Sequence, residues 1–373
     1  MTQFNVVDVI ILLGIAQGLF LTITLPTVHQ NNTSANRVLS LQLAMACLVL
    51  FAKMAIYKAD AFWVIQRAIL LDPFIFLYGP LGYIYLKRLL EKGNTTFKLK
   101  WFHYLPACIY LSYLIYINLQ PEETFKENWM GGAFLVPFFW AELLALIHNW
   151  IFWYICGSLV FQYQKNEKHQ LSFSQSTTSF IRITHVIVGF ILFLWVLSFL
   201  NTNFIGLHFW VINYDMVWVG IPILIYIVGY YALRQPEIFR IQIEPEQEKT
   251  PAKQRLPESE IKVLQSKLED LIETEKVYLK NELTLVDLSQ KLNTTTNNLS
   301  WLLNNIYKTS FYEFINRYRV EEFLNKIENR EHSKRTLLSL SLEVGFNSKS
   351  TFNKAFKSAL NDTPSNYIRK MEM

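Results

Sequence analysis

Charged residues are distributed very unevenly along this chain of 373 residues. Residues 1–240 contain 15 Lys or Arg and 11 Asp or Glu residues, whereas the shorter remainder contains 20 and 19. Of the whole chain, 51% is hydrophobic and only 17% is charged, while a typical soluble domain is about one quarter charged. This pattern excludes a single soluble globule, a disordered chain and a fibrous protein. It indicates a membrane-embedded part followed by a water-soluble part.

Seven runs in the first part are long and apolar enough to be membrane-spanning helices, which need about 20 such residues. They cover about residues 6–28, 38–57, 68–86, 102–119, 134–161, 183–200 and 211–233. Eleven Lys or Arg residues fall in the loops on one side of these runs and three in the loops on the other. Because cytoplasmic loops are enriched in Lys and Arg, we expect a multi-pass protein with its N-terminus outside and its C-terminus in the cytoplasm.

Three ionisable residues inside the runs are candidates for sensing a signal: Glu142, His148 and Asp215. The alternative for each is structural, either a hydrogen bond between helices or a side chain that extends to the membrane surface. Metal-ligand spacings, phosphate-binding loops and nucleophile motifs do not occur in the sequence, so we expect no catalytic residue, no metal and no cofactor.

The sequence divides into four segments. They are a transmembrane sensor or anchor (1–234), a cytoplasmic linker with four prolines (235–257), a connecting helix (258–281) and a soluble domain (282–373). The connecting helix has an apolar stripe at Ile261, Leu264, Leu268 and Leu271. This stripe could pair with a second chain in a coiled coil, or it could pack on the domain that follows.

The soluble domain contains an internal repeat. Residues 284–292 read TLVDLSQKL and residues 336–344 read TLLSLSLEV. In each copy a Thr can cap a helix with an inward apolar face, and Asn293 or Gly345 suits the left-handed backbone after it. A second helix follows each turn, at about 296–307 with Leu299, Leu302, Leu303 and Ile306 inward, and at about 349–359 with Phe352, Ala355 and Phe356 inward. Two helix-turn-helix units are therefore predicted, and the whole chain is expected to be all-α, a helical membrane bundle followed by a soluble helical domain.

These motifs resemble the DNA-binding domain of AraC/XylS-type transcription regulators over residues 283–368. The resemblance rests on LTLVDLSQKL and LSWLLNN in the first unit, SFYEFINRYRVEE in the bridging helix, and LEVGFNSKSTFNKAFK with TPSNY in the second unit. The combination with seven spans is similar to the membrane-bound regulators of this type in Bacteroidetes-like bacteria. That resemblance implies a bacterial cytoplasmic (inner) membrane location.

In that family the second helix of each unit enters the DNA major groove. By position, the resemblance implies DNA contacts by Asn297, Ser300, Trp301 and Asn304 in the first unit, and by Lys349, Ser350, Asn353, Lys354 and Lys357 in the second. Asn suits adenine and Lys suits guanine, although an exposed Asn or Lys by itself is ordinary surface. Six basic residues could reach phosphates: Lys308, Lys334, Arg335, Lys357, Arg369 and Lys370. Arg317 and Arg319 are instead expected to pair with Glu313, Glu321 or Glu322 in the bridging helix.

The leading hypothesis is a membrane-anchored transcription regulator that senses an unknown signal ligand. Its expected partners are double-stranded promoter DNA and the lipid bilayer, and a homodimer and a contact with RNA polymerase stay open. One alternative is a membrane transporter or enzyme with a regulatory helical appendage, and another is a receptor whose helical domain binds protein. The signal could reach DNA through cleavage of the linker or with the domain still tethered.

Overall fold

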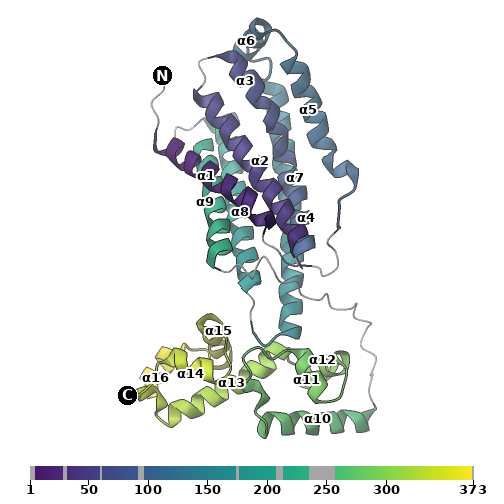
Figure 1. Ribbon diagram of the computed structural model, residues 1–373, viewed down its shortest axis with the longest axis vertical. Helices are drawn as coiled ribbons and strands as arrows, with labels where there is room; N and C mark the ends of the chain where they lie inside the picture. Colours follow the sequence, from purple (N-terminus) through teal and green to yellow (C-terminus); the bar gives the residue numbers. More distant parts are fainter. Residues whose placement is uncertain are drawn as a thin grey trace. The chain divides into compact units, whose positions relative to one another are not determined.

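The computed structural model describes residues 5–27, 32–58, 61–90, 96–173, 176–206, 213–234 and 257–371. These residues are helical almost throughout, and β-pairing among them is limited to one isolated antiparallel bridge between Leu171 and Thr284. The all-α prediction is confirmed (Figure 1). Nearly all of the predicted linker, residues 235–256, lies outside the described residues.

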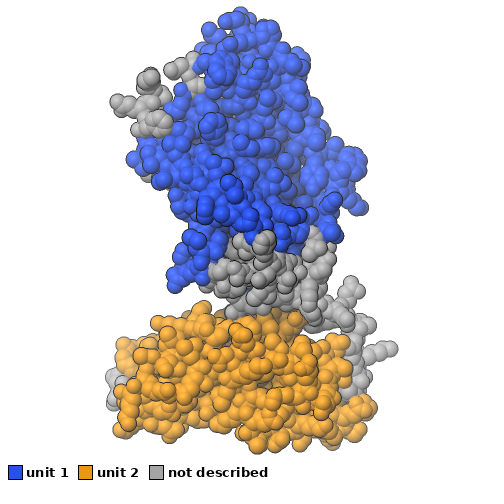
Figure 2. Space-filling model, viewed as in Figure 1, with its two compact units in different colours: residues 1–161, 176–245 blue, residues 162–175, 246–373 orange. Residues whose placement is uncertain are grey.

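The chain forms two compact units, which Figure 2 distinguishes by colour. Unit 1 consists of residues 1–161 and 176–245, and unit 2 consists of residues 162–175 and 246–373. Unit 2 therefore contains a short segment, 162–175, that is far in sequence from the rest of it. This segment was not distinguished from the transmembrane part in the sequence.

Unit 1 is an all-helical bundle. Its α-helices are α1 (Val6–Thr24), α2 (Thr33–Lys58), α3 (Phe62–Ala68), α4 (Tyr78–Leu90), α5 (Leu105–Asn118), α6 (Glu122–Met130), the first part of α7 (Leu135–Gln170), α8 (Ser176–Leu200) and α9 (Tyr214–Arg234). Helix α1 packs against both α2 and α9. The contact with α9 is close because Gly14 faces Pro222, where an added Cβ would lie only 2.6 Å from the Pro222 Cβ. Small residues allow this close approach of helices in membranes.

Five helices of the described residues are long and apolar enough to cross a membrane: α1, α2, α7, α8 and α9. The pair formed by Phe62–Phe76 and α4, bent by 43°, would make a sixth. The prediction of seven spans is therefore not confirmed. The run at 102–119 forms a 3-10 helix, Trp101–Tyr104, followed by the 14-residue α5. At 1.5 Å per residue α5 alone is about 21 Å long, which is shorter than the roughly 30 Å hydrocarbon core.

The surface of these helices is strongly apolar. Ile23, Phe51 and Val186 are examples of large apolar side chains that lie mostly exposed along their helices. Water disfavours an apolar surface of this extent, whereas lipid does not. The five or six long helices and this surface are consistent with a membrane protein.

Unit 2 has two hydrophobic cores joined by one helix. Its α-helices are the end of α7, then α10 (Glu258–Glu273), α11 (Leu285–Lys291), α12 (Thr296–Asn305), α13 (Phe311–Glu328), α14 (Leu337–Glu343), α15 (Lys349–Leu360) and α16 (Pro364–Met371). The first core joins α10, α11, α12 and the start of α13, and the second joins the end of α13 with α14, α15 and α16. Helix α13 runs between the two groups of helices (Figure 1). Its Phe311 and Ile315 belong to the first core, and its Phe323 and Ile327 belong to the second.

The structure decides between the two roles of the connecting-helix stripe. Ile261, Leu264, Leu268 and Leu271 are all buried in the first core of the same chain. They pack on the following domain and leave no apolar stripe for a coiled coil. The helix also ends at Glu273, earlier than expected, and Tyr278 reaches the core from a short 3-10 turn, Val277–Leu279.

Candidate nucleic-acid interface

Each helix-turn-helix unit begins with a capped helix. The Thr284 hydroxyl accepts a hydrogen bond from the Asp287 N–H, and the Asp287 carboxylate accepts one from the Thr284 N–H. Burial raises the pKa of Asp287, but the hydrogen bonds from Thr284 and Lys280 outweigh it and the pKa is lowered. The Thr336 hydroxyl caps α14 by accepting a hydrogen bond from the Ser339 N–H. Both predicted caps are confirmed, and they satisfy N–H groups that the helix itself leaves unpaired.

The turn within each unit requires a backbone with positive φ. Asn293 has φ 50° and Gly345 has φ 100°, as their sequence positions predicted. At Gly345 space is also decisive, because an added Cβ would lie 2.5 Å from the Tyr278 carbonyl oxygen and 2.9 Å from the Arg319 Nε. These two turns set the angle at which the second helix of each unit leaves the first.

The second helices, α12 and α15, bury one face each. Leu299, Leu302 and Leu303 of α12 are fully buried, as are the Phe352 and Phe356 side chains of α15 to within 2%. The prediction for Ile306 is wrong. It follows the last residue of α12 and is 41% exposed, because the helix ends at Asn305, two residues before the predicted end at about 307.

Helix α15 presents a continuous polar and basic face to solvent. All five residues predicted from the sequence, Lys349, Ser350, Asn353, Lys354 and Lys357, are exposed, as are Ser358 and Ala359 near the end of the helix. Their opposite face is the second core, so the helix cannot rotate without exposing Phe352 and Phe356. A face of this composition can donate hydrogen bonds to base edges and neutralise phosphates.

Helix α12 presents fewer exposed polar side chains than α15 does. Asn297 is exposed, but Ser300 accepts a hydrogen bond from Asn304 and both are only partly exposed. Trp301 is partly buried and packs against the first core. Asn304 and Lys308 line a pocket of about 290 Å³ in unit 2 that also includes Lys165, Lys168 and His169. The sequence did not predict that the basic residues of segment 162–175 lie beside a candidate DNA-binding residue of α12.

The predicted phosphate contacts fall into two groups. Arg335 pairs with Glu343 at 2.6 Å, Lys370 pairs with Asp362 at 2.7 Å, and Arg369 donates to the Asn366 side chain. Lys308, Lys334 and Lys357 are exposed. Within the described residues these three lysines form no ion pair, so they can reach a phosphate without first giving one up.

The two arginines of the bridging helix behave differently from each other. Arg317 lies near Glu321 at 3.9 Å, in the pairing expected from the sequence. The prediction for Arg319 is wrong, because its side chain is fully buried and donates to backbone carbonyls rather than to a Glu. Burial lowers the pKa of Arg319 to about 10. Its spacing of four from Ile315 and Phe323, both of them core residues, was the available signal that it faces inward.

Comparison with known families assigns this part of the chain. Residues 288–370 match the family model of the helix-turn-helix domain. The match extends from α11 to α16 and supports a DNA-binding transcription regulator of the AraC type. Comparisons with curated proteins and with solved structures gave no match.

The candidate sensing residues of unit 1 lie in different surroundings. Glu142 accepts hydrogen bonds of 2.7 Å from the Trp195 indole N–H and the Tyr214 hydroxyl, which joins α7, α8 and α9. Asp215 is the neighbour of Tyr214 and accepts a hydrogen bond from the Asn213 amide. Glu142 and Asp215 therefore belong to the same region of the bundle.

His148 does not share that polar group. Its ring packs edge-on against Phe76 and tilted against Phe152, and its Nε2 is buried without a hydrogen-bond partner among the described residues. A second polar contact that the sequence did not predict is the ion pair of Lys53 with Asp72 at 3.2 Å. Within the described residues, no group of three or more His, Cys, Asp or Glu side chains could hold a metal ion.

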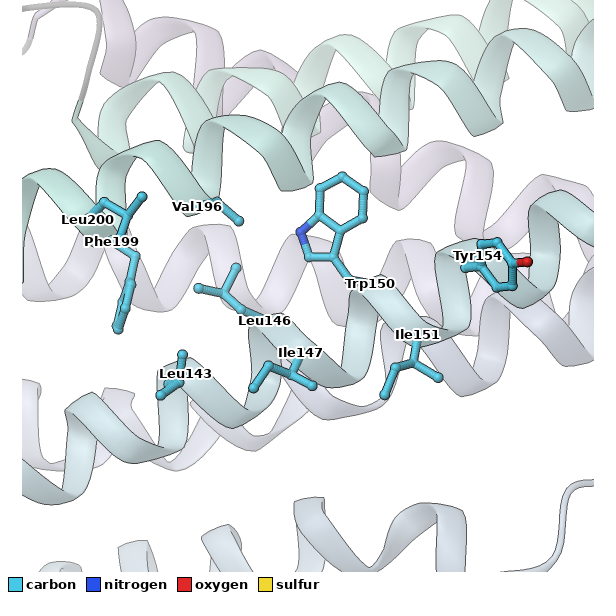
Figure 3. A pocket seen from close by; sticks show the side chains of 9 residues that line it. All are labelled: Leu143, Leu146, Ile147, Trp150, Ile151, Tyr154, Val196, Phe199 and Leu200. Carbon is cyan, nitrogen blue, oxygen red and sulfur yellow. The ribbon is translucent and has the colours of Figure 1, made fainter.

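One hollow on unit 1 is almost entirely apolar. Figure 3 shows nine side chains of α7 and α8 around a space of about 530 Å³, among them Leu146, Trp150 and Phe199. Several of them, such as Ile147 and Tyr154, are exposed. A hollow lined almost entirely by apolar groups offers a polar ligand little to bind, whereas lipid chains can fill it.

Proposed function

We propose that the chain is a membrane-anchored, sequence-specific DNA-binding transcription regulator. The observation that carries this proposal is α15, where five exposed polar or basic residues stand opposite a phenylalanine core in a helix-turn-helix unit. In such units the second helix enters the major groove and its exposed face reads the bases. Two units on one chain can reach two successive major-groove faces, which are about 34–36 Å apart.

The base readers proposed are Lys349, Ser350, Asn353 and Lys354, with Lys357 on the phosphate backbone. Asn297 extends the same role to α12. Trp301 contributes to packing first, and its exposed edge is left for a thymine methyl group or a sugar. The first unit therefore contributes less to specificity than the second.

The signal is proposed to act on unit 1. The polar group around Glu142 connects three helices, so a ligand or a proton that competes for its hydrogen bonds would change their packing. His148 and Asp215 are the further candidates. A bacterial inner membrane location with unit 2 in the cytoplasm follows from the distribution of Lys and Arg and from the need to reach DNA.

Genome-wide DNA crosslinking of the intact protein in its host tests the central proposal. We expect enrichment at a limited set of promoters, and we expect the Lys349→Ala/Lys354→Ala variant to lose it while remaining in the membrane. Uniform recovery of DNA by both proteins would instead favour the receptor whose helical domain binds protein. Uptake or turnover of a substrate by membranes that contain the chain would favour the transporter or enzyme.

Reporter fusions test the topology. A fusion after Lys98 or Arg240 should report the cytoplasm, and a fusion after Lys126 should report the outside. The Lys126 fusion decides whether the short α5, together with Trp101–Tyr104, crosses the membrane. A cytoplasmic signal there would show that it does not.

A further inference from the structure

Segment 162–175 is hydrogen-bonded to the interior of unit 2 at one serine, Ser172. Ser172 is fully buried, and its N–H and its hydroxyl both donate to the Leu283 carbonyl. Its carbonyl accepts from the Asn316 amide at 2.9 Å and from the Arg319 guanidinium at 3.1 Å, and its hydroxyl accepts from the same guanidinium at 3.1 Å. Leu171 beside it is buried and forms the antiparallel bridge with Thr284.

Arg319 connects this serine to both helix-turn-helix units. It donates to the Tyr278 and Lys280 carbonyls, each at 2.7 Å, in the chain that leads into the first unit. Its guanidinium also lies 5.8 Å from the centre of the Phe346 ring, in the turn of the second unit. The Gly345 turn cannot accept a side chain there, since an added Cβ would meet the Arg319 Nε. One buried side chain therefore contacts the approach to the first unit, the turn of the second and Ser172.

The chain on both sides of Ser172 leads directly into long apolar helices. Helix α7 ends at Gln170, two residues before Ser172, and runs unbroken from Leu135. Helix α8 begins at Ser176, four residues after Ser172, and four residues span at most about 14 Å. Because α7 ends only two residues before Ser172, a shift of its end by more than a few ångströms would have to displace Ser172 from its partners. The four residues on the other side limit how far the start of α8 can move away.

We propose that Leu171 and Ser172 form a docking element through which the transmembrane helices control the DNA-binding domain. Docked, Ser172 completes the hydrogen bonds around Arg319 and holds the two helix-turn-helix units at one spacing. When Ser172 is undocked, the Arg319 guanidinium and the Leu283 carbonyl lose hydrogen-bond partners. The two helix-turn-helix units are then free to change their relative position. This inference rests on the proposed function, and it favours regulation with the domain still tethered rather than release by cleavage in the linker.

A disulfide crosslink tests the docking in the full chain. In a background whose three native cysteines are replaced by alanine, Leu171→Cys/Thr284→Cys should oxidise readily in the membrane, since residues opposite each other on antiparallel strands are within disulfide range. The control pair Leu171→Cys/Lys291→Cys places the second cysteine at the far end of α11 and should not crosslink. Equal crosslinking of the two pairs, or none of the first pair, would overturn the docking.

A DNA-binding measurement tests whether the docking element regulates the DNA-binding domain. The probe is a duplex selected from a random pool by the unaltered protein in lipid nanodiscs, with random-sequence DNA beside it. Ser172→Trp cannot fit a fully buried site, and we expect it to weaken specific binding about tenfold while binding to random DNA changes little. The matched control, Asn166→Trp, replaces an exposed residue at the end of α7 and should bind as the unaltered protein does.

The possible results separate the inference from the proposed function. If Ser172→Trp binds the selected duplex normally although the Leu171–Thr284 crosslink forms, the element docks but controls nothing, and the inference is overturned. If Ser172→Trp loses both kinds of DNA binding equally, the serine serves the stability of unit 2 alone, which also overturns it. If the unaltered protein selects no sequence, the proposed function itself fails, whatever the crosslink shows.

Discussion

The Arg319 guanidinium donates hydrogen bonds to both the carbonyl and the hydroxyl oxygen of Ser172, each at 3.1 Å, across 147 residues of sequence. Both hydrogen bonds are buried, so the loss of either one leaves an oxygen or an N–H without water to replace its partner. The contact is therefore costly to break and is well suited to transmit a displacement.

Removing the Arg319 side chain should destabilise unit 2 strongly. Arg319→Met keeps the apolar stem but removes the donors to the buried Tyr278 carbonyl, to the part-buried Lys280 carbonyl and to Ser172, at about 1–3 kcal/mol for each buried group left unpaired. We expect a loss of about 3 kcal/mol or more in urea unfolding followed by tryptophan fluorescence. Arg317→Met is the matched control, since Arg317 is half exposed with one distant ion pair, and it should cost less than about 0.5 kcal/mol. Similar losses for the two variants would contradict the burial assigned to Arg319.

The helix caps of the two helix-turn-helix units should contribute similar amounts to the free energy of unfolding. Thr284→Ala and Thr336→Ala each remove the hydroxyl that accepts a hydrogen bond from the first turn, which typically costs about 1 kcal/mol. Replacement by Ser, which keeps the hydroxyl, should restore most of it in the same unfolding measurement. A Ser variant as unstable as the Ala variant would assign the loss to the threonine methyl group.

Base readers and phosphate contacts on α15 should differ in selectivity. Lys349→Ala and Lys354→Ala should each weaken binding to the selected duplex by about 1–3 kcal/mol and change random DNA less. Lys357→Ala should weaken both about equally and lower the slope of log affinity against log salt by about one. Titrations at several salt concentrations measure this. An equal loss on both DNAs for all three variants would show that α15 does not read bases.

The connecting helix should stabilise unit 2 without joining two chains. Leu268 is fully buried in the first core, so Leu268→Ala should cost about 2–5 kcal/mol. Val263→Ala, at a site that is 55% exposed, is the control and should cost little. Light scattering in detergent should give the same mass for the unaltered protein, Leu268→Ala and Val263→Ala. A lower mass for Leu268→Ala alone would show that the connecting helix pairs two chains in a coiled coil.

Alkaline pH should weaken the contact between Tyr278 and α13. Burial, together with Glu322, raises the pKa of Tyr278 to about 12, above its ordinary value of 10. A raised pKa means that the stability Tyr278 contributes is complete below pH 10 and is lost as the pH rises towards 12. Tyr278→Phe should therefore flatten the fall of the free energy of unfolding in this window. An unchanged slope would show that another group causes the alkaline loss.

Local pattern determined much of this protein. The shortage of charge before residue 240 separates apolar helices from a soluble part, and the spacing of Thr284, Asn293, Thr336 and Gly345 defines two helix-turn-helix units, because caps and left-handed turns depend on near neighbours. The exposed face of α15 follows from its apolar period in the same way.

Tertiary structure decided what depends on distant partners. The stripe from Ile261 to Leu271 suits a dimer seam or a core equally well, and only the position of the first core shows that it packs within the chain. Arg319 has glutamates within one helical turn, yet it bonds to carbonyls 39 and 41 residues away and to Ser172. Helical period tells which side chains share a face but not which segment covers it. That choice is made by packing and by the need of buried polar groups for partners, wherever in the sequence those partners lie.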